Sequence, residues 1–551
     1  MNLSAWLHIS SRLTFPSGSS TLSRMLKHKP IIFLLTVSLI GGFVIFYTTQ
    51  NGPWGYSDSV AYLVSARNLI KGVGLGYHYP NGEFRPLMFY PPLYSLLIAF
   101  GSFFSKDVVF TARGLGILIY AFTVFGVGLI LHRFARFTII TIFGFFILAI
   151  YPPLLILFSS VMSEPLYSLT MIYTVYALLN YFDTGKINWF VTSAIFAGCV
   201  SLTRYIGLSV LVAMPVCVFL FEQGSYKARF VKAIQYGALS AILFILWLAW
   251  TYLNPVNHSV AGRGFDLSWE VIYSNLKFFY DAYISTLWQS IPLPESIARL
   301  PVAWKYITTG IIFLSLYNFA FRSYRRDPSN NDGFRVSIVF GVLAISYSLI
   351  LLAATLFTSP APVFNDRMFL PVFTSLVLSF VGACSAILIH TRPIIQQASF
   401  IVLGLLFLFC VYNFIIQDIT AIADLRRGDT NTGNRWREDQ IMQTLRSLPD
   451  RTPIISTNPD VVLLWADRPA YDLNEHLSPS FLASANLYGA DATDPSQAAF
   501  QQGGILVVFN NYQAVIKGAY GNVGKERLKT MFDGLTIYGT FDKGTLYTYP
   551  K

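Results

Sequence analysis

The sequence predicts a polytopic α-helical membrane protein with about 11 transmembrane helices, followed by a small α/β domain outside the membrane. Three observations predict this fold class. The 551 residues are 54% hydrophobic and only 12% charged, whereas a soluble domain carries about 25% charged residues. The apolar residues of segment 31–418 fall into runs of membrane-spanning length. From residue 419 to residue 551 the composition becomes polar.

The spans are assigned as apolar stretches of about 17 to 25 residues. The run from 187 to 221 is long for one helix and short for two. We divide it at Arg204, because a charged side chain at the centre of a span costs roughly 2.5 to 3.5 kcal/mol on insertion scales. The expected spans are Ile31 to Thr48, Val108 to Leu131, Phe137 to Leu157, Glu164 to Phe182, Ile187 to Leu202, Tyr205 to Phe221, Ala233 to Leu253, Val302 to Phe321, Val336 to Phe357, Phe369 to His390, and Ala398 to Ile416.

The orientation follows from the basic residues. Segment 1–30 is basic, and the first apolar run lacks a small-residue cleavage site, which predicts an uncleaved anchor. Lys and Arg gather in alternate loops, so we expect the N-terminus in the cytoplasm and the long first loop, 51–107, outside. Arginines between 426 and 437 conflict with this rule, but long domains translocate largely regardless of charge. We therefore expect a bacterial plasma (inner) membrane protein with domain 419–551 on the outer side.

Composition also excludes some functions. The net charge of +11 does not indicate nucleic-acid binding, because the basic residues are scattered through short loops and form no stripe. The lipid bilayer is the partner that these residues favour. The four Cys all lie inside apolar runs, and the seven His include no HExxH motif. Neither a disulfide framework nor a zinc enzyme is expected.

The first outer loop, 51–107, is far longer than a helix connection requires. Ser57 or Asp58 can cap a short helix that ends at Ile70. A second apolar element, Pro91 to Phe104, is too short to cross, so we expect it at the interface or as a re-entrant segment. The loop is therefore predicted to fold as a unit against the membrane, with Asp58 just beyond the first span.

The polar C-terminal segment has the size of one ordinary domain. Gln440 to Leu448 reads as an amphipathic helix. Pro453 to Ser456 and Gly504 to Phe509 read as buried strands, and Leu535 to Tyr549 reads as a hairpin. Together they predict a small α/β domain with its own core.

Ionisable residues recur at the outward ends of the expected spans. Asp58 follows the first span in YSDSVAY, and a PPLY element at 91–94 ends the first loop. Further along are Arg113 in FTARGLG, Glu164 in MSEPLY, Arg204 in GCVSLTRYIG, and the NDRMFLP segment at 365–371. In this order the features resemble the GT-C superfamily of integral membrane glycosyltransferases, in particular its protein O-mannosyltransferase and aminoarabinose-transferase branch.

The resemblance implies transfer of a sugar from a polyprenyl-phosphate-linked donor to a hydroxyl of a protein, lipid or glycan acceptor, with inversion. An acceptor hydroxyl needs a general base, for which Asp58 is the first candidate. Glu164 would orient the acceptor, share a proton, or join Asp58 around a divalent cation; no cofactor is certain. The cations expected to stabilise the leaving phosphate are Arg204, Arg85, Arg113 and Arg367. The expected substrate contacts are Tyr56, His78, Glu83 and Asp366.

One departure from the branch is visible. An acidic–basic pair directly precedes its PPL element, whereas Phe89 and Tyr90 stand there in this chain. Glu83 and Arg85, several residues earlier, are the expected replacement. Aromatic residues of the loop such as Tyr90 are more often interface anchors than sugar platforms.

Each candidate also has a structural explanation. Asp58 can cap a helix, Glu164 can complement a helix dipole, and Arg204 can snorkel to the interface. Arg113 can pack the loop against its span, and Asp366 with Arg367 can form a polar pair at a helix end. 

Two other classes of protein compete with the enzyme. A transporter or lipid flippase also needs many spans and charges, but such proteins tend to show internal repeats and interrupted helices at the midplane. We see no repeat, and the ionisable residues lie at the outer ends of spans. A catalytically silent relative, whose outer domain binds a partner, is the third hypothesis.

Overall fold

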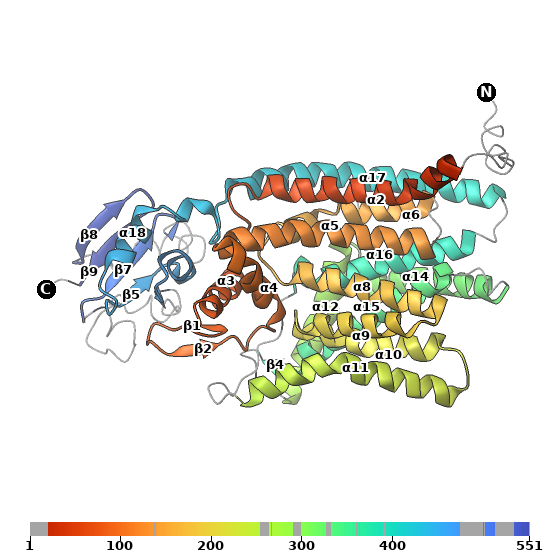
Figure 1. The fold of residues 1–551 in the computed structure, drawn as a ribbon, viewed down its shortest axis with the longest axis horizontal. Helices are drawn as coiled ribbons and strands as arrows, with labels where there is room; N and C mark the ends of the chain where they lie inside the picture. Colours follow the sequence, from red (N-terminus) through yellow and green to blue (C-terminus); the bar gives the residue numbers. More distant parts are fainter. Residues whose placement is uncertain are drawn as a thin grey trace, which may run out of the picture.

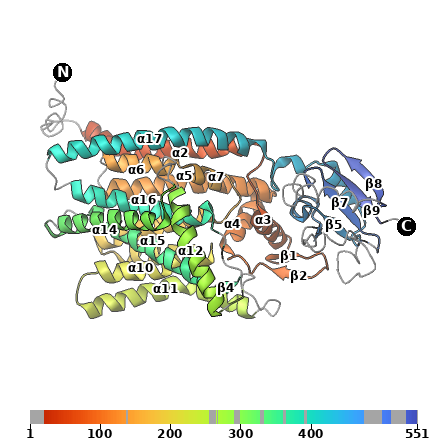
Figure 2. The same ribbon diagram turned by 180° about the vertical axis from the view of Figure 1, so that it is seen from behind.

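The protein is described here by a computed structural model that covers residues 20–135, 139–253, 264–265, 267–289, 299–326, 332–359, 362, 364–388, 393–473, 500, 502–512 and 534–549. Long helices lie side by side in a bundle, and a small sheet domain stands at one end of it (Figure 1). Elements of the first loop lie between the bundle and the sheet domain in both views (Figures 1 and 2). We call this end of the bundle the site end.

The expected spans coincide with helices in the described parts of the chain. Six of these described helices are each long and apolar enough to cross a membrane, and the pair α6 and α7, bent by 46°, would make a seventh crossing. A multi-pass helical membrane protein is thereby confirmed. The number eleven stays a prediction, because α9 and α10 have only 15 and 14 residues. The bundle helices are α2 (Ser20–Thr48), α5 (Val108–Phe134), α6 (Ile139–Ala149), α7 (Pro152–Phe158), α8 (Glu164–Thr184), α9 (Ile187–Ser201), α10 (Leu208–Phe221), α11 (Tyr226–Leu253), α14 (Val302–Arg326), α15 (Asp332–Phe357), α16 (Asp366–Leu388) and α17 (Pro393–Arg427).

The break between α9 and α10 has a local cause. The division of this run at Arg204 is confirmed: α9 ends at Ser201, and a 3-10 turn, η1 (Tyr205–Gly207), leads into α10. A Cβ at Gly207 would lie 2.6 Å from the backbone of Ser201, so only glycine lets the chain fold back this closely. Arg204 is thus presented at a turn rather than inside a helix.

The first loop folds into two helices and a hairpin. They are α3 (Ser57–Ile70), β1 (Gly76–His78), β2 (Phe84–Pro86) and α4 (Leu93–Ser105). Helix α4 packs against α3 and α5, while its Phe103 and Phe104 are each 72% exposed. An exposed aromatic face on a short apolar helix is typical of an element at the membrane interface.

The C-terminal domain contains the predicted helix, strands and hairpin. Its sheet has the order β6-β5-β7-β9-β8; β5 pairs in parallel with β6 and β7, and β9 is antiparallel to β7 and β8. Helix α17 continues past the expected boundary at 418 and ends at Arg427. The elements are η4 (Asn434–Trp436), α18 (Gln440–Ser447), β5 (Ile454–Ser456), α19 (Pro459–Val461), η5 (Val462–Ala466), β6 (Tyr471–Asp472), β7 (Ile505–Phe509), β8 (Thr536–Phe541) and β9 (Gly544–Thr548).

One further helix covers the side of the bundle. Helix α12 (Trp269–Gln289) packs against α14, α15 and α16 and is steeply inclined to them in Figure 2. Strand β3 (Gly264–Phe265), shortly before α12 in the chain, pairs with β4 (Thr358–Ser359), which follows α15. Helix α12 thereby closes one wall of the bundle near the start of α16.

The C-terminal domain is docked directly on the start of the first loop. The backbone N–H of Asn434 donates to the carbonyl of Asn51 at 2.9 Å, and the Thr432 hydroxyl donates to the carbonyl of Pro53. Gly52 has a φ of +107°, which favours glycine; a Cβ there would lie 2.8 Å from the Thr432 carbonyl oxygen. These backbone contacts fix the domain relative to the residues that lead into α3.

Asp467 ties the same domain to the end of α3. Its carboxylate accepts hydrogen bonds from Arg67 at 3.2 Å and from Lys71 at 2.5 Å. Burial would raise the pKa of Asp467, but the hydrogen bond from Lys71 and the charge of Arg67 outweigh burial and lower it. A carboxyl group with a lowered folded-state pKa contributes stability above its unfolded-state pKa and loses it as pH falls through the folded-state pKa. The contact should therefore hold at neutral pH and weaken below about pH 4.

We expect Asp467→Asn to lower the free energy of unfolding at pH 7 by no more than about 1 kcal/mol, because the pair is partly solvated. Asn tolerates the left-handed backbone of this position, φ 57°, as Asp does, so the substitution tests the charge alone. The measurement is the difference in thermal midpoint between the two proteins at pH 7 and at pH 3. The difference should be smaller at pH 3 than at pH 7, and a difference of equal size at both pH values would contradict the role of the carboxylate charge.

Candidate functional site

The start of the first loop is held against the corner between α7 and α8. The backbone N–H of Trp54 donates to the Ser159 carbonyl at 2.9 Å, and the N–H of Val161 donates to the Trp54 carbonyl at 2.8 Å. Two hydrogen bonds of this kind form a short parallel bridge. They place the beginning of α3, with Asp58, beside Glu164 at the beginning of α8.

The end of the same loop is held against the turn that carries Arg204. The backbone N–H of Leu93 donates to the Leu202 carbonyl at 3.0 Å, and the Tyr205 hydroxyl donates to the Met88 carbonyl at 2.7 Å. The PPLY region is therefore fixed to the break between α9 and α10. Segments that are far apart in the sequence meet at one place because both ends of the loop are anchored.

Four of the charged residues identified in the sequence meet here. Glu164, only 2% exposed, forms an ion pair with Arg204. Arg367, in the first turn of α16, lies between the two carboxylates: its Nη1 is 3.6 Å from Asp58 Oδ2, and its Nε is 3.9 Å from Glu164 Oε1. The side chains of Asp58, Arg204 and Arg367 keep 26–29% of their surface exposed. We call these four residues the charge cluster; it carries no net formal charge.

Asp58 is oriented by Tyr90. The Tyr90 hydroxyl donates to Asp58 Oδ1 at 2.7 Å. Burial and the neighbouring Asp58 raise the pKa of Tyr90, so the phenol stays protonated and continues to donate. The expectation that Ser57 or Asp58 caps α3 is wrong: the helix begins at Ser57 with Tyr56 in the cap position, and Ser59 Oγ accepts from the backbone N–H of Tyr56 at 2.9 Å. A carboxylate that no helix N–H holds is available for chemistry at the cluster.

The sequence suggested that Arg367 forms a polar pair with Asp366, but the structure gives Arg367 other neighbours. Its guanidinium lies 5.2 Å from the centre of the Tyr56 ring and 3.8 Å from the Met162 sulfur. Asp366 is exposed at the first residue of α16. The Tyr56 ring and the Met162 sulfur are weak partners for a guanidinium. The two carboxylate contacts of Arg367 are both longer than a normal hydrogen bond.

The other expected site residues lie outside the charge cluster. Arg113 donates to Thr49 Oγ1 and to the Phe46 carbonyl, each at 3.0 Å, and so joins α5 to the end of α2. Glu83 and Arg85 pair with each other at 3.3 Å on the hairpin, so they do not replace the acidic–basic pair of the branch at the cluster. His78 is exposed on β1.

The alternative in which Glu164 joins Asp58 around a divalent cation does not fit the described geometry. The Arg367 guanidinium occupies the space between the two carboxylates. Within the described ranges, no group of three His, Cys, Asp or Glu side chains is placed to hold a metal ion. The residues as arranged do not fit a divalent cation, and we derive no step through one.

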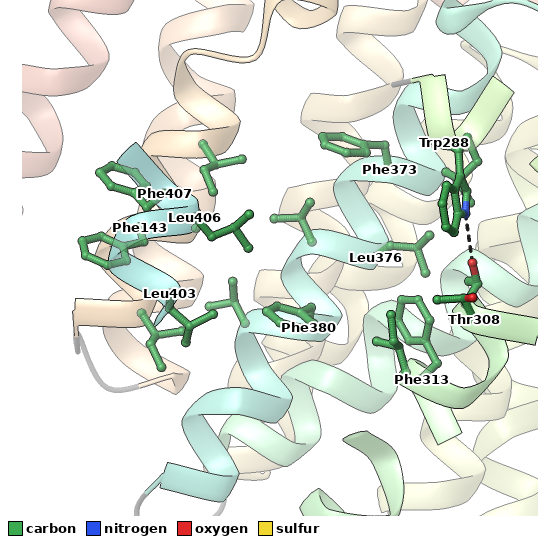
Figure 3. Close-up of a pocket in the computed structure, with 18 residues that line it drawn as sticks. Phe143, Trp288, Thr308, Phe313, Phe373, Leu376, Phe380, Leu403, Leu406 and Phe407 are labelled. Atoms are coloured by element: carbon green, nitrogen blue, oxygen red, sulfur yellow. Dashed lines mark hydrogen bonds between the residues drawn. The ribbon is translucent and has the colours of Figure 1, made fainter. Parts of the chain in front are cut away.

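An apolar cavity of about 380 Å³ lies deeper in the bundle, between α6, α12, α14, α16 and α17 (Figure 3). Phe373, Leu376 and Phe380 of α16 line one part of it. Across the cavity, the Trp288 indole N–H donates to Thr309 Oγ1 at 3.0 Å. No charged side chain is present among the described residues that line this cavity.

The cavity and the charge cluster share one helix. Arg367 stands in the first turn of α16 and Phe373 follows six residues later, which is about 9 Å along a helix. A charged group and an apolar cavity therefore follow one another along this helix.

No protein-family model and no curated protein sequence matches this chain, but solved structures do. ArnT from Cupriavidus metallidurans, bound to undecaprenyl phosphate, has a TM-score of 0.51 and 12% identity, over 95% of this chain and 100% of that one. The apo state of the same protein gives 0.50 and 10%, over 95% and 99%. The Archaeoglobus fulgidus oligosaccharyltransferase in complex with Zn and sulfate gives 0.51 and 12%, over 93% and 73%.

These proteins are members of the GT-C superfamily. The chain has the GT-C fold. The resemblance noted in the sequence is thereby confirmed at the level of architecture, over nearly the whole chain rather than only its first part. 

One residue that contacts the charge cluster was not identified from its sequence pattern. Tyr90 was expected to be an interface anchor, yet it holds Asp58. The signal that would have found it was its position directly before the PPL element, where the GT-C branch has an acidic–basic pair. A residue in that position contacts the cluster because Leu93, three residues later, is bonded to Leu202.

Proposed function

We propose that this chain is a membrane glycosyltransferase that moves a sugar from a polyprenyl-phosphate-linked donor to an acceptor hydroxyl at the outer face of the membrane, with inversion. The observation that carries the proposal is the charge cluster at the site end of a GT-C bundle, where Arg367 and Arg204 meet Asp58 and Glu164. We place the protein in a bacterial plasma membrane, with its N-terminus in the cytoplasm and its C-terminal domain outside.

Arg367 is the cation that we assign to the donor phosphate. Arg204 is already paired with the buried Glu164. Arg367 stands 3.6 Å and 3.9 Å from its two carboxylates, beyond hydrogen-bond length. A phosphate oxygen offers it shorter, charge-assisted hydrogen bonds. Donor binding is therefore expected to draw Arg367 away from Asp58. Arg204, which pairs with the same Glu164 carboxylate, would add positive charge near the phosphate.

Asp58 is the general base in this proposal. Once Arg367 turns to the phosphate, the Asp58 carboxylate is released from its contact with that guanidinium and can reach the acceptor hydroxyl. The hydrogen bond from Tyr90 keeps one carboxylate oxygen fixed, which leaves the other to accept the proton of the acceptor hydroxyl. The acceptor oxygen then attacks the anomeric carbon of the donor sugar while the polyprenyl phosphate leaves. A single displacement of this kind inverts the configuration of the anomeric carbon.

The apolar cavity is where we place the lipid chain of the donor. The cavity begins about two turns below Arg367 on α16, and aromatic and aliphatic side chains line it. A prenyl chain placed there would contact an apolar lining. Its binding would bury no polar group without a hydrogen-bond partner, so it would carry no such free-energy cost.

A transporter or lipid flippase remains the alternative class. The described ion pairs between bundle helices lie at the two ends of the bundle, such as Arg204 with Glu164 at one end and Arg133 with Asp183 at the other. A transport path would need charged or interrupted elements near the middle of the membrane. No specific observation favours transport over sugar transfer.

The lipid assignment is tested by binding of undecaprenyl phosphate to the purified full-length protein, measured by native mass spectrometry. Arg367→Gln should weaken binding about 10- to 100-fold, because it removes charge-assisted hydrogen bonds to the phosphate. Arg133→Gln, the same change at the opposite end of the bundle, should leave binding unchanged. Equal affinity of the Arg367 variant and the wild type would remove Arg367 from the phosphate site.

A further inference from the structure

A large polar cavity lies where the first loop meets the C-terminal domain. Its volume is about 830 Å³, within the range of about 300 to 1,000 Å³ of small-molecule sites. Ser57 is part of its lining and is the neighbour of Asp58 in the first turn of α3. The cavity therefore adjoins the residue proposed as general base.

Aromatic rings form one part of the lining. Tyr77 and Tyr79 of the hairpin are stacked with their ring centres 5.6 Å apart and their planes at 15°. The Arg85 guanidinium lies 3.8 Å from the centre of the Tyr79 ring and fixes it from one side. Rigid tyrosine rings bind the apolar faces of polyhydroxylated ligands, and their hydroxyls can hydrogen-bond at the edge.

Amide and carboxylate groups of the C-terminal domain form another part. The Asn458 amide donates to Asn431 Oδ1 at 3.0 Å, and the Asn431 amide donates to Asp460 Oδ2 at 3.4 Å. This chain of hydrogen bonds orients three planar polar groups along the cavity. Planar groups with fixed donors and acceptors suit the paired hydroxyls of a sugar ring.

The charge of the lining selects against anions. Asp460 and Asp472 line the cavity, and no Lys or Arg occurs among its described lining residues. Burial raises the pKa of Asp460; the hydrogen bond with Ser57 opposes this rise, and the nearby charges of Asp472 and Asp58 add to it. A phosphate, sulfate or carboxylate group on the ligand would meet the same repulsion.

We propose that this cavity binds the acceptor and that the acceptor is a saccharide without negative charge. The inference rests on the proposed function, and it assigns the C-terminal domain a direct part in substrate binding. Stacked tyrosines on the first loop and the amide chain on the domain would hold the sugar between them. Its free hydroxyl would then point past Ser57 toward Asp58.

The test is binding of the full-length protein in nanodiscs to an array of neutral, amine-bearing, sulfated, phosphorylated and sialylated oligosaccharides. We expect binding to neutral or amine-bearing glycans only. Asp460→Asn and Tyr79→Ala should each weaken that binding about ten-fold. Asp542→Asn and Tyr538→Ala, the same substitutions on the β8–β9 hairpin, are the matched controls, and thermal midpoints show whether each variant is folded.

Three results would overturn the inference: no glycan bound, a preference for anionic glycans, or binding that the folded Asp460 and Tyr79 variants retain in full. The Asp58→Asn variant separates this inference from the proposed function. It should bind the same glycans as the wild type, because Asp58 acts on the hydroxyl after the acceptor is bound. Loss of sugar transfer in that variant without glycan binding by the wild type would leave the proposed function standing and remove the cavity from it.

Discussion

Asp58→Asn is expected to lower the rate of sugar transfer about 10²- to 10⁴-fold, the contribution of a positioned general base. The Asn side chain keeps the shape of Asp and can still accept the hydrogen bond from Tyr90, but it cannot take up a proton. The measurement uses membranes that contain the full-length protein and a mixture of lipid-linked sugars labelled in the sugar. Transfer is measured as the loss of label from the organic phase, so the assay does not require the identity of the sugar.

The matched control is Asp183→Asn. Asp183 pairs with Arg133 at the end of the bundle opposite the site, and both side chains are about 45% exposed. The same chemical change there should leave the rate of transfer unchanged. A transfer rate for the Asp58 variant within about two-fold of the wild type would remove the carboxylate from the mechanism, because even the weakest general base contributes more than that.

Glu164→Gln is expected to give the largest loss of stability, about 3 kcal/mol. Glu164 is 2% exposed and pairs with Arg204. Its replacement leaves a guanidinium in the bundle without a counter-charge, and removal of one partner of a buried pair costs more than removal of both. The expected value is at the lower end of the usual range because Arg204 keeps 26% of its side chain exposed. The measurement is the thermal midpoint of the purified protein in one detergent.

The double variant Glu164→Gln with Arg204→Gln should recover part of the loss, because it leaves no unpaired charge. Arg133→Gln breaks an exposed pair and should change the free energy of unfolding by less than about 1 kcal/mol. If the Glu164 variant were no less stable than the Arg133 variant, the ion pair with Arg204 would not be a buried interaction.

Much of the bundle and the four residues of the charge cluster could be predicted from the sequence, because these features depend on local patterns. Long apolar runs locate the helices, and the cost of burying a charge located the turn at Arg204. Asp58, Glu164 and Arg367 were identified because each stands at the outward end of an expected span, in an order that resembles one superfamily. Residues at the same end of a bundle have a high chance of meeting.

The directions of loop side chains could not be predicted, because long-range contacts determine them. The bonds between Trp54 and Ser159, and between Leu93 and Leu202, decide which loop residues face the cluster. As a result Tyr90 reaches Asp58, whereas Arg85 remains on the hairpin with Glu83. The polar cavity could not be predicted either, since most of its lining residues come from the C-terminal domain and the others from the first loop.

Helix α17 has a consequence for how substrates arrive. It runs without a break for 35 residues, from Pro393 to Arg427, a rod of about 52 Å. Near its end Arg426 bonds to Gln50 at 3.2 Å and covers the Tyr47 ring. The C-terminal domain is thus mounted on a stiff, braced helix and not on a flexible tether. Under the proposed function, this rigid mounting would require an acceptor to come to the domain at the membrane surface.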